Sequence, residues 1–150
     1  MMSERKPKVL LIEDDGGDEM LTLRALRQYT SGVSVFVARD GEQAVQVIRL
    51  LGGQLEDYPS LILLDLNLPK VSGFEVLALV KGSPELAGIP VAIVTGDHDA
   101  DTEAQCMNLG ADAVLKKPVG YNEYLEMLRP IFIQTLGSVI LAEADAVTLL

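Results

Sequence analysis

Cysteine, histidine and tryptophan are nearly absent from this chain of 150 residues, which has one Cys, one His and no Trp. A single cysteine cannot form an internal disulfide, and such usage is typical of a reducing cytoplasm. One Cys and one His also cannot supply the four ligands of a structural zinc site. We therefore expect a cytoplasmic protein without disulfides or thiolate-bound metal.

Basic residues are scarce, because 12 Lys and Arg face 22 Asp and Glu and give a formal net charge of −10. A negative field repels phosphate backbones, so direct binding of nucleic acid is disfavoured. Long hydrophobic runs are lacking as well: runs such as Leu61 to Leu64 fall far short of the about 20 residues in a membrane span. The segment from Met1 to Lys8 has no signal-peptide pattern. We expect one domain that binds neither nucleic acid nor membranes.

Hydrophobic residues make up 49% of the chain, enough for a core, and they follow two alternating patterns. Five short runs are mostly apolar throughout, as in strands that are buried on both faces of a parallel sheet. The segments between them have the spacing of amphipathic helices. The runs are 9–12, 33–38, 61–64, 91–94 and 113–115, and helical spacing is clearest at Ala44, Val47, Ile48 and Leu51 and at Leu125, Leu128 and Phe132.

This alternation predicts an α/β fold with a doubly wound, five-stranded parallel sheet in the order 2-1-3-4-5, which is flavodoxin-like. Asp15 and Asp18 have the spacing of an N-cap residue and an acid in the first turn of the first helix. We assign residues 1–136 to the domain and residues 137–150 to a C-terminal extension. The apolar tail from Val139 to Leu150 is expected to pack on its own domain or on a partner.

Polar residues stand where four of the predicted strands end. Glu13 and Asp14 follow the first, Asp65 follows the third, Thr95 follows the fourth and Lys117 follows the fifth. These ends meet at one edge of a parallel sheet, so we expect the side chains to converge. Crowded carboxylates repel, and Mg²⁺ offsets that repulsion while leaving positions open for phosphate oxygens. A lysine and a threonine then supply a positive charge and a hydrogen bond to a phosphoryl group.

Four separated motifs carry these residues: Leu11-Ile12-Glu13-Asp14-Asp15, Leu61 to Pro69 with Gly73, Thr95-Gly96 and Lys117-Pro118. Their order and spacing over residues 8–135 resemble the receiver domain of response regulators. Further residues are similar to those of the single-domain regulators that pair with phytochrome-type histidine kinases. These are Asp18, Leu21-Thr22, Ala25-Leu26, Asp40-Gly41, Ser83-Pro84-Glu85-Leu86 and Ile89-Pro90.

The resemblance implies that Asp65 is the phosphoacceptor, a carboxylate nucleophile that forms an acyl phosphate. It also implies a Mg²⁺ site made by Asp14, Asp65 and the backbone carbonyl of Asn67. Glu13 would hold a metal-bound water from outside the ligand sphere.

The resemblance further implies that Thr95 and Lys117 each bind an oxygen of the phosphoryl group. The Lys117-Pro118 bond is expected to be cis and to aim the lysine inward. Gly96 stands where the family has a small residue, which leaves room for the phosphoryl group.

Two further sets of residues follow from the family pattern. Asn67 and Asp97 would face the path of the water that hydrolyses the acyl phosphate, and would orient it by hydrogen bonds. Phosphotransfer requires the kinase to dock over the first helix and the loop after the fifth strand. The residues expected on that partner face are Met20, Leu21, Arg24, Pro118 and Val119.

One position departs from the family. Three residues before Lys117, the family often has an aromatic side chain that rotates inward when the threonine binds phosphate, and this chain has Val114. A valine cannot make that rotation, so we expect a shift of the loop after the fourth strand to carry the signal.

The resulting expectation is a single-domain regulator that accepts a phosphoryl group from a histidine kinase and signals by protein contacts, and that is not an enzyme with turnover. A phosphate sink and a phosphorylation-independent adaptor are the alternatives. A phosphatase of the Asp-x-Asp type is disfavoured because Asn67 cannot transfer protons. Nucleotide binding has no support, since the glycine-rich phosphate-binding motifs are absent from the sequence. A homodimer is expected from the apolar tail and the last helix.

Four other residues are candidates for either a structural or a functional role. Cys106 is expected in the core, and His98 is expected to be a plain exposed loop residue. Tyr121 and Tyr124, at the start of the last helix, suit either packing or an interaction face equally well.

Overall fold

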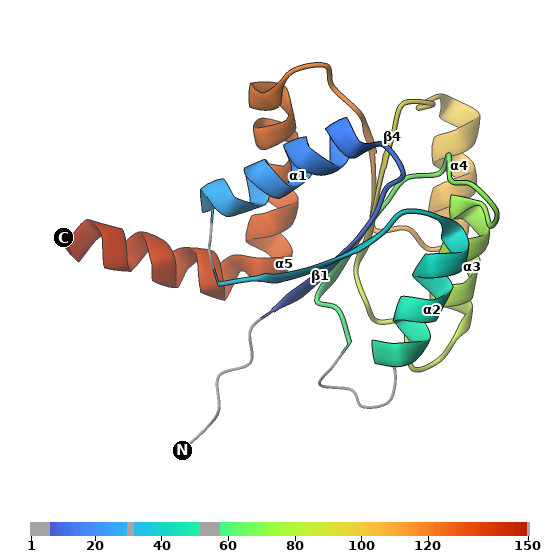
Figure 1. The fold of residues 1–150 in the computed structure, drawn as a ribbon, viewed down its shortest axis with the longest axis horizontal. Helices are drawn as coiled ribbons and strands as arrows, with labels where there is room; N and C mark the ends of the chain where they lie inside the picture. Colours follow the sequence, from blue (N-terminus) through green and yellow to red (C-terminus); the bar gives the residue numbers. More distant parts are fainter. Residues whose placement is uncertain (1–6, 30–31, 52–57, 150) are drawn as a thin grey trace.

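The computed structural model describes residues 7–29, 32–51 and 58–149, with five strands and five helices in strict alternation in these ranges (Figure 1). The predicted strands are all present, and the second begins one residue later than expected. The elements are β1 Lys8–Ile12, α1 Gly16–Tyr29, β2 Ser34–Ala38, α2 Gly41–Leu51, β3 Leu61–Leu64, α3 Gly73–Gly82, β4 Val91–Thr95, α4 Ala100–Asn108, β5 Ala113–Lys116 and α5 Tyr121–Leu149.

The sheet is parallel throughout and has the order β2-β1-β3-β4-β5, which confirms the predicted fold. Helices α1 and α5 cover one face, and α2, α3 and α4 cover the other (Figure 1). Each face has its own hydrophobic cluster, and β3 lies at the centre with all four residues buried. Burial on both faces explains why the central strands are apolar at every position.

Helix α1 begins where the sequence predicted. The backbone amide of Asp18 donates a hydrogen bond to Asp15 Oδ1 over 2.8 Å, as expected of an N-cap. Helices α3 and α4 are capped in the same way, by Ser72 and Asp99. These caps fix where each helix begins relative to the strand before it.

Gly73, the first residue of α3, lies against the end of β3. A Cβ atom at this position would lie 2.4 Å from the Asp65 carbonyl oxygen and 2.5 Å from Leu66 Cα. Both neighbours are backbone atoms, so neither can move aside alone. The glycine therefore lets α3 begin directly beside the end of β3, where Asp65 is attached.

Helix α5 is 29 residues long and is kinked at Leu136, which has φ −121° and ψ 17°. Beyond the kink the helix runs away from the sheet (Figure 1). The predicted boundary between the domain and its C-terminal extension, at residue 136, coincides with the kink but stays a prediction. The side chains from residue 138 onward lie outside the described residues. Among the helices of the described ranges, none is both long enough and apolar enough to cross a membrane.

Candidate functional site

Three carboxylates meet where β1 and β3 end. Glu13 and Asp65 are buried, with 4% and 5% exposure, whereas Asp14 is exposed. One carboxylate oxygen of each lies within 4.8 Å of the others. The Asp65 amide donates to the Ile12 carbonyl over 3.0 Å, which extends the β1–β3 pairing up to the cluster. Three acidic oxygens at this spacing fit a hard divalent cation.

Lys117 projects into this cluster from the loop after β5. Its Nζ lies 2.8 Å from Glu13 Oε1, 2.8 Å from Asp18 Oδ2 and 2.7 Å from Asp65 Oδ2. Burial of the amine opposes its charged form, but the hydrogen bonds to Asp18, Asp65 and Glu13 outweigh burial and raise the pKa of Lys117. The lysine is therefore a fixed positive charge at the carboxylates.

The expected cis bond before Pro118 is wrong for this structure, in which the Lys117-Pro118 bond is trans. The trans bond still leads the Lys117 amine to Asp65. The backbone amide of Lys117 donates to the Thr95 carbonyl over 2.9 Å, so the loop leaves β5 close to the end of β4.

Burial is the main influence on Glu13, and it raises the pKa of this carboxyl to about 8. The Asp65 carboxylate raises it further, and the hydrogen bond from Lys117 opposes the change. A buried acid beside another acid is costly to ionise without a compensating cation. Glu13 thus has the environment expected of a residue that faces a metal ion.

Thr95 ends β4 and is fully buried. Its Oγ1 accepts a 3.3 Å hydrogen bond from the Asp97 amide, and the Asn67 amide donates to Asp65 Oδ1 over 3.2 Å. The side chains of the two loops also meet, since Asn67 Nδ2 donates to Asp97 Oδ2 over 2.7 Å. A Cβ atom at Gly96 would meet nothing within 4 Å, so the space beside Thr95 is open.

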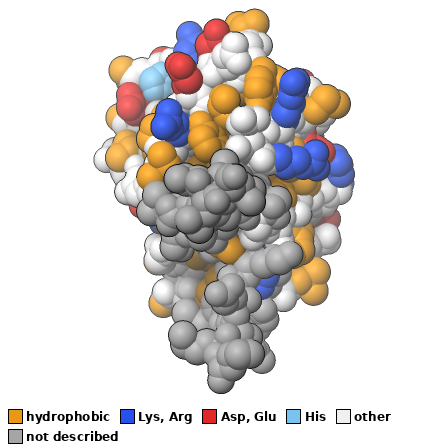
Figure 2. Space-filling model, turned by 90° about the vertical axis from the view of Figure 1, so that its left-hand side faces the viewer, with side chains coloured by type: hydrophobic (Ala, Val, Ile, Leu, Met, Phe, Trp, Pro, Cys, Tyr) orange, Lys and Arg blue, Asp and Glu red, His pale blue; other side chains and the backbone are white. Residues whose placement is uncertain are grey.

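The residues assigned to the partner face lie on two elements. Met20 and Val119 are exposed apolar side chains, at 69% and 100%, and Arg24 is exposed as well. Pro118 and Leu21 are half-buried. The helix and the loop belong to one side of the molecule, the side of α1 and α5, where apolar side chains lie among separate basic ones (Figure 2).

The remaining candidate residues differ in burial. Cys106 is fully buried in the core, as predicted, and His98 is partly exposed. Tyr124 is fully buried, so it cannot form an exposed interaction face, whereas Tyr121 is half-buried with the Arg24 guanidinium 4.4 Å from its ring centre. Val114 is half-buried against the α2–α3–α4 cluster.

Asp18 is the site residue that sequence reasoning missed. Its position in the first turn of α1 suggested only an acid at a helix N-terminus, yet its carboxylate bonds Lys117 across 99 positions of the chain. The sequence shows only that the first turn of α1 follows closely on Glu13 and Asp14; the contact with Lys117 depends on tertiary packing.

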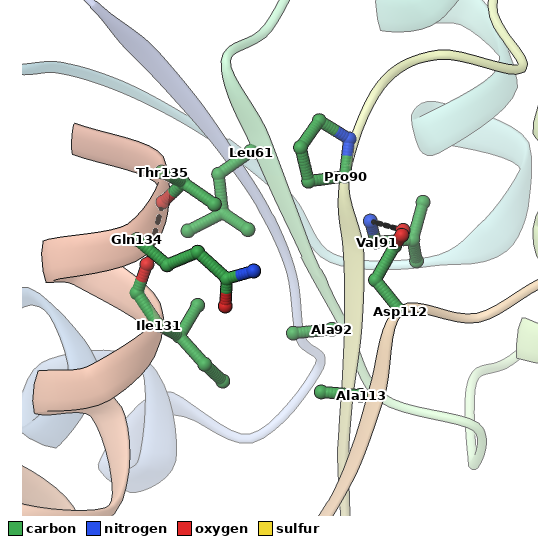
Figure 3. A pocket seen from close by; sticks show the side chains of 9 residues that line it. All are labelled: Leu61, Pro90, Val91, Ala92, Asp112, Ala113, Ile131, Gln134 and Thr135. Atoms are coloured by element: carbon green, nitrogen blue, oxygen red, sulfur yellow. Dashed lines mark hydrogen bonds between the residues drawn. The ribbon is translucent and has the colours of Figure 1, made fainter.

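A cavity of about 300 Å³ lies away from these residues, between α5 and the ends of the strands opposite to the carboxylates (Figure 3). Within it, Asp112 Oδ2 already accepts a 2.8 Å hydrogen bond from the Val91 amide. The cavity is therefore not part of the carboxylate site. Its lining is Leu61, Pro90, Val91, Ala92, Asp112, Ala113, Ile131, Gln134 and Thr135.

Comparison with known proteins agrees with the geometry. The chain is 36% identical over 127 residues to response regulator Rcp1 of Synechocystis, covering 83% of this chain and 86% of Rcp1. The crystal structure of the phosphorylated cyanobacterial phytochrome response regulator RcpA superposes with a TM-score of 0.80, at 30% identity, covering 89% of this chain and 96% of RcpA. The Mn²⁺-bound form of Rcp1 superposes with a TM-score of 0.73, at 34% identity, covering 85% and 92%.

The family model of the response regulator receiver domain matches residues 9–129. That range contains the three clustered carboxylates, Thr95 and Lys117. The chain belongs to the response regulator receiver domain family.

Proposed function

We propose that Asp65 accepts a phosphoryl group from a phosphohistidine of a histidine kinase. An Asp65 carboxylate oxygen attacks phosphorus, the N–P bond of the donor breaks, and the imidazole leaves while an acyl phosphate forms. The observation that carries this proposal is the 2.7 Å contact between Lys117 Nζ and Asp65 Oδ2. It sets a buried positive charge where the charge of the phosphoryl oxygens develops.

We assign the cation of this site to Mg²⁺, held by Asp14, Asp65 and the Asn67 carbonyl, with Glu13 beside it. A divalent cation supplies charge neutralisation for the carboxylates and the phosphoryl oxygens. In this chain Lys117 contacts both Glu13 and Asp65, and we assign to Thr95, at the end of β4, a hydrogen bond to a phosphoryl oxygen.

The kinase partner is proposed to be of the phytochrome type, which the similarity to the phytochrome response regulator RcpA supports. It would dock on the partner face, where Met20 and Val119 offer apolar contact and Arg24 offers charge. The net charge of −10 favours signalling through protein contacts rather than nucleic acid.

Phosphotransfer tests the proposal. A phytochrome-type histidine kinase labelled on its histidine should transfer the label to the parent chain and to Glu85→Gln, an exposed control position, but not to Asp65→Asn. Val119→Glu should slow transfer from the kinase while leaving labelling by acetyl phosphate unchanged, because it alters docking and not chemistry. Labelling of Asp65→Asn by the kinase would show that the phosphoacceptor is another residue.

We also propose that the chain forms a homodimer through α5 and its extension. The kinked helix runs beyond the sheet, and an apolar helix in water favours association. Sedimentation of the full chain and of a chain that ends at Gly137 is the measurement. A dimer is expected for the first and a monomer for the second, and two monomers would contradict the proposal.

A further inference from the structure

Three carboxylate oxygens surround the Lys117 ammonium group: Nζ donates hydrogen bonds to Asp18 and Asp65, and Glu13 Oε1 lies 2.8 Å from it. An ammonium group has three donors and no acceptor, and Lys117 Nζ has three carboxylate partners, Glu13, Asp18 and Asp65. With carboxylate oxygens already at 2.7, 2.8 and 2.8 Å, a phosphoryl oxygen can reach this ammonium group only if one carboxylate moves away. Which carboxylate moves depends on how firmly each one is held.

Asp18 is the partner that is easiest to release. Its side chain is 28% exposed, against 5% for Glu13 and 5% for Asp65, so water can replace part of what it loses. It also lies outside the group of three carboxylates that could share a cation. Glu13 and Asp65 would remain beside the cation, whereas among the described residues Asp18 is held in the site by Lys117 alone.

A second hydrogen-bond donor, the Tyr124 hydroxyl, lies beside Asp18. Tyr124, on the first turn of α5, is fully buried, and its hydroxyl makes no hydrogen bond of good geometry within the described part of the chain, although the Asp18 carboxylate lies close to it. Burial raises the pKa of Tyr124, and the nearby Asp18 carboxylate raises it further, so the hydroxyl keeps its proton and can donate it. A buried polar group without a well-formed hydrogen bond is unfavourable, which favours any rearrangement that provides one.

We propose that Asp18 is a positioning residue of the phosphorylation site, and that its carboxylate exchanges Lys117 for the Tyr124 hydroxyl when Asp65 is phosphorylated. The inference rests on the proposed function and deepens it. In the unmodified chain Asp18 helps to hold Lys117 among the acids. After modification Lys117 turns its third donor to the phosphoryl group, and Asp18 accepts from Tyr124.

The exchange couples the site to α5. Tyr124 is on the same helix as Leu125, whose carbonyl accepts a 3.2 Å hydrogen bond from the Tyr29 hydroxyl of α1. A new bond between Asp18 and Tyr124 would tighten these two helices near the phosphoryl group. This route to α5 needs no aromatic side chain at position 114, which is valine.

Binding of beryllofluoride, a stable mimic of the acyl phosphate, tests the exchange with Mg²⁺ present. Because ligand binding and the exchange are linked, Tyr124→Phe should weaken beryllofluoride affinity by about fivefold, the worth of one hydrogen bond. In the background of Asp18→Ala, the same change should have no effect. A ring that merely packs would give equal effects in both backgrounds, and that result would overturn the proposal.

Tyr121→Phe is the matched control, since Tyr121 is on the same turn of α5 but contacts Arg24. The affinity of this variant for beryllofluoride should equal that of the parent. Labelling by acetyl phosphate separates the two proposals. If the parent and Tyr124→Phe are both labelled by acetyl phosphate but bind beryllofluoride with equal affinity, the exchange is refuted and the proposed function stands. If the parent is not labelled, the proposed function is refuted.

The parent chain also allows a test without substitution. The Tyr124 hydroxyl proton should move downfield in the NMR spectrum when beryllofluoride is added, as expected of a hydroxyl that begins to donate to a carboxylate. A resonance that stays in place would overturn the exchange even if the variants failed to fold.

Discussion

The Asn67 side-chain amide donates a hydrogen bond to the Asp97 carboxylate over 2.7 Å and joins the loop after β3 to the loop after β4. Both residues lie two positions beyond a site residue, Asp65 and Thr95 respectively. The bond crosses between the two loops that border the phosphoacceptor. We therefore predict that an attacking water meets a polar pair of fixed orientation.

Hydrolysis of the acyl phosphate should depend on this pair. Replacing both Asn67 and Asp97 with leucine should slow spontaneous dephosphorylation by about fivefold or more, the worth of one oriented hydrogen bond. Loss of label over time measures the rate, and Glu85→Leu serves as an exposed control. Equal decay in the double variant and the parent would contradict the assigned role.

Metal removal should be visible in stability. The proposed Mg²⁺ site exists only in the folded chain, so Mg²⁺ at about a hundred times its dissociation constant should raise the free energy of unfolding by about 2.7 kcal/mol, and EDTA should reverse the gain. Asp14→Ala should abolish the gain, whereas Asp101→Ala, an exposed acid on α4, should keep it. Urea unfolding with and without Mg²⁺ is the measurement, and a full gain in Asp14→Ala would remove this residue from the site.

Gly73 offers a test of the backbone contact beside Asp65. Gly73→Ala should lower the free energy of unfolding by about 1–3 kcal/mol, because the added methyl group meets backbone atoms at 2.4 and 2.5 Å. Gly82→Ala is the matched control on the same helix, where a Cβ meets nothing within 4 Å, and it should leave stability equal or higher. Equal unfolding midpoints in urea for the parent and both variants would show that the loop adapts without strain.

Cys106 should be chemically silent in the folded chain. Burial raises the pKa of its thiol, so a thiol reagent at about pH 8 should react far more slowly than with the urea-unfolded chain. The folded chain holds this proton more tightly than the unfolded chain, so stability should fall as pH rises past about 8.5, and Cys106→Ala should remove that part. Rapid labelling of the folded chain would place the thiol at the surface.

The fold and most of the site were predictable because they depend on local patterns. Apolar runs marked the strands, strict alternation fixed the parallel order, and strand ends located Asp14, Asp65 and Lys117. The role of Asp18 was not predictable, since its bond to Lys117 depends on how α1 and the loop after β5 pack. The same holds for the Asn67–Asp97 bond, which requires the relative placement of two loops.

Tertiary packing also decided questions that the sequence left open. From the sequence, Tyr121 and Tyr124 suit packing and partner contact equally well. In the structure, the position of α5 against α1 buries Tyr124 completely. The family resemblance implies a cis bond before Pro118, and the bond is trans in the structure. Neither outcome leaves a trace in composition or periodicity.

The central claim is that Asp65 is the residue that carries the phosphoryl group. Intact-mass spectrometry after treatment with acetyl phosphate tests it most directly, on the parent and on Asp65→Asn, each with Mg²⁺ and with EDTA. The account predicts one hydroxylamine-labile phosphoryl adduct on the parent with Mg²⁺ and no adduct in the other three samples. Equal labelling of Asp65→Asn would contradict it.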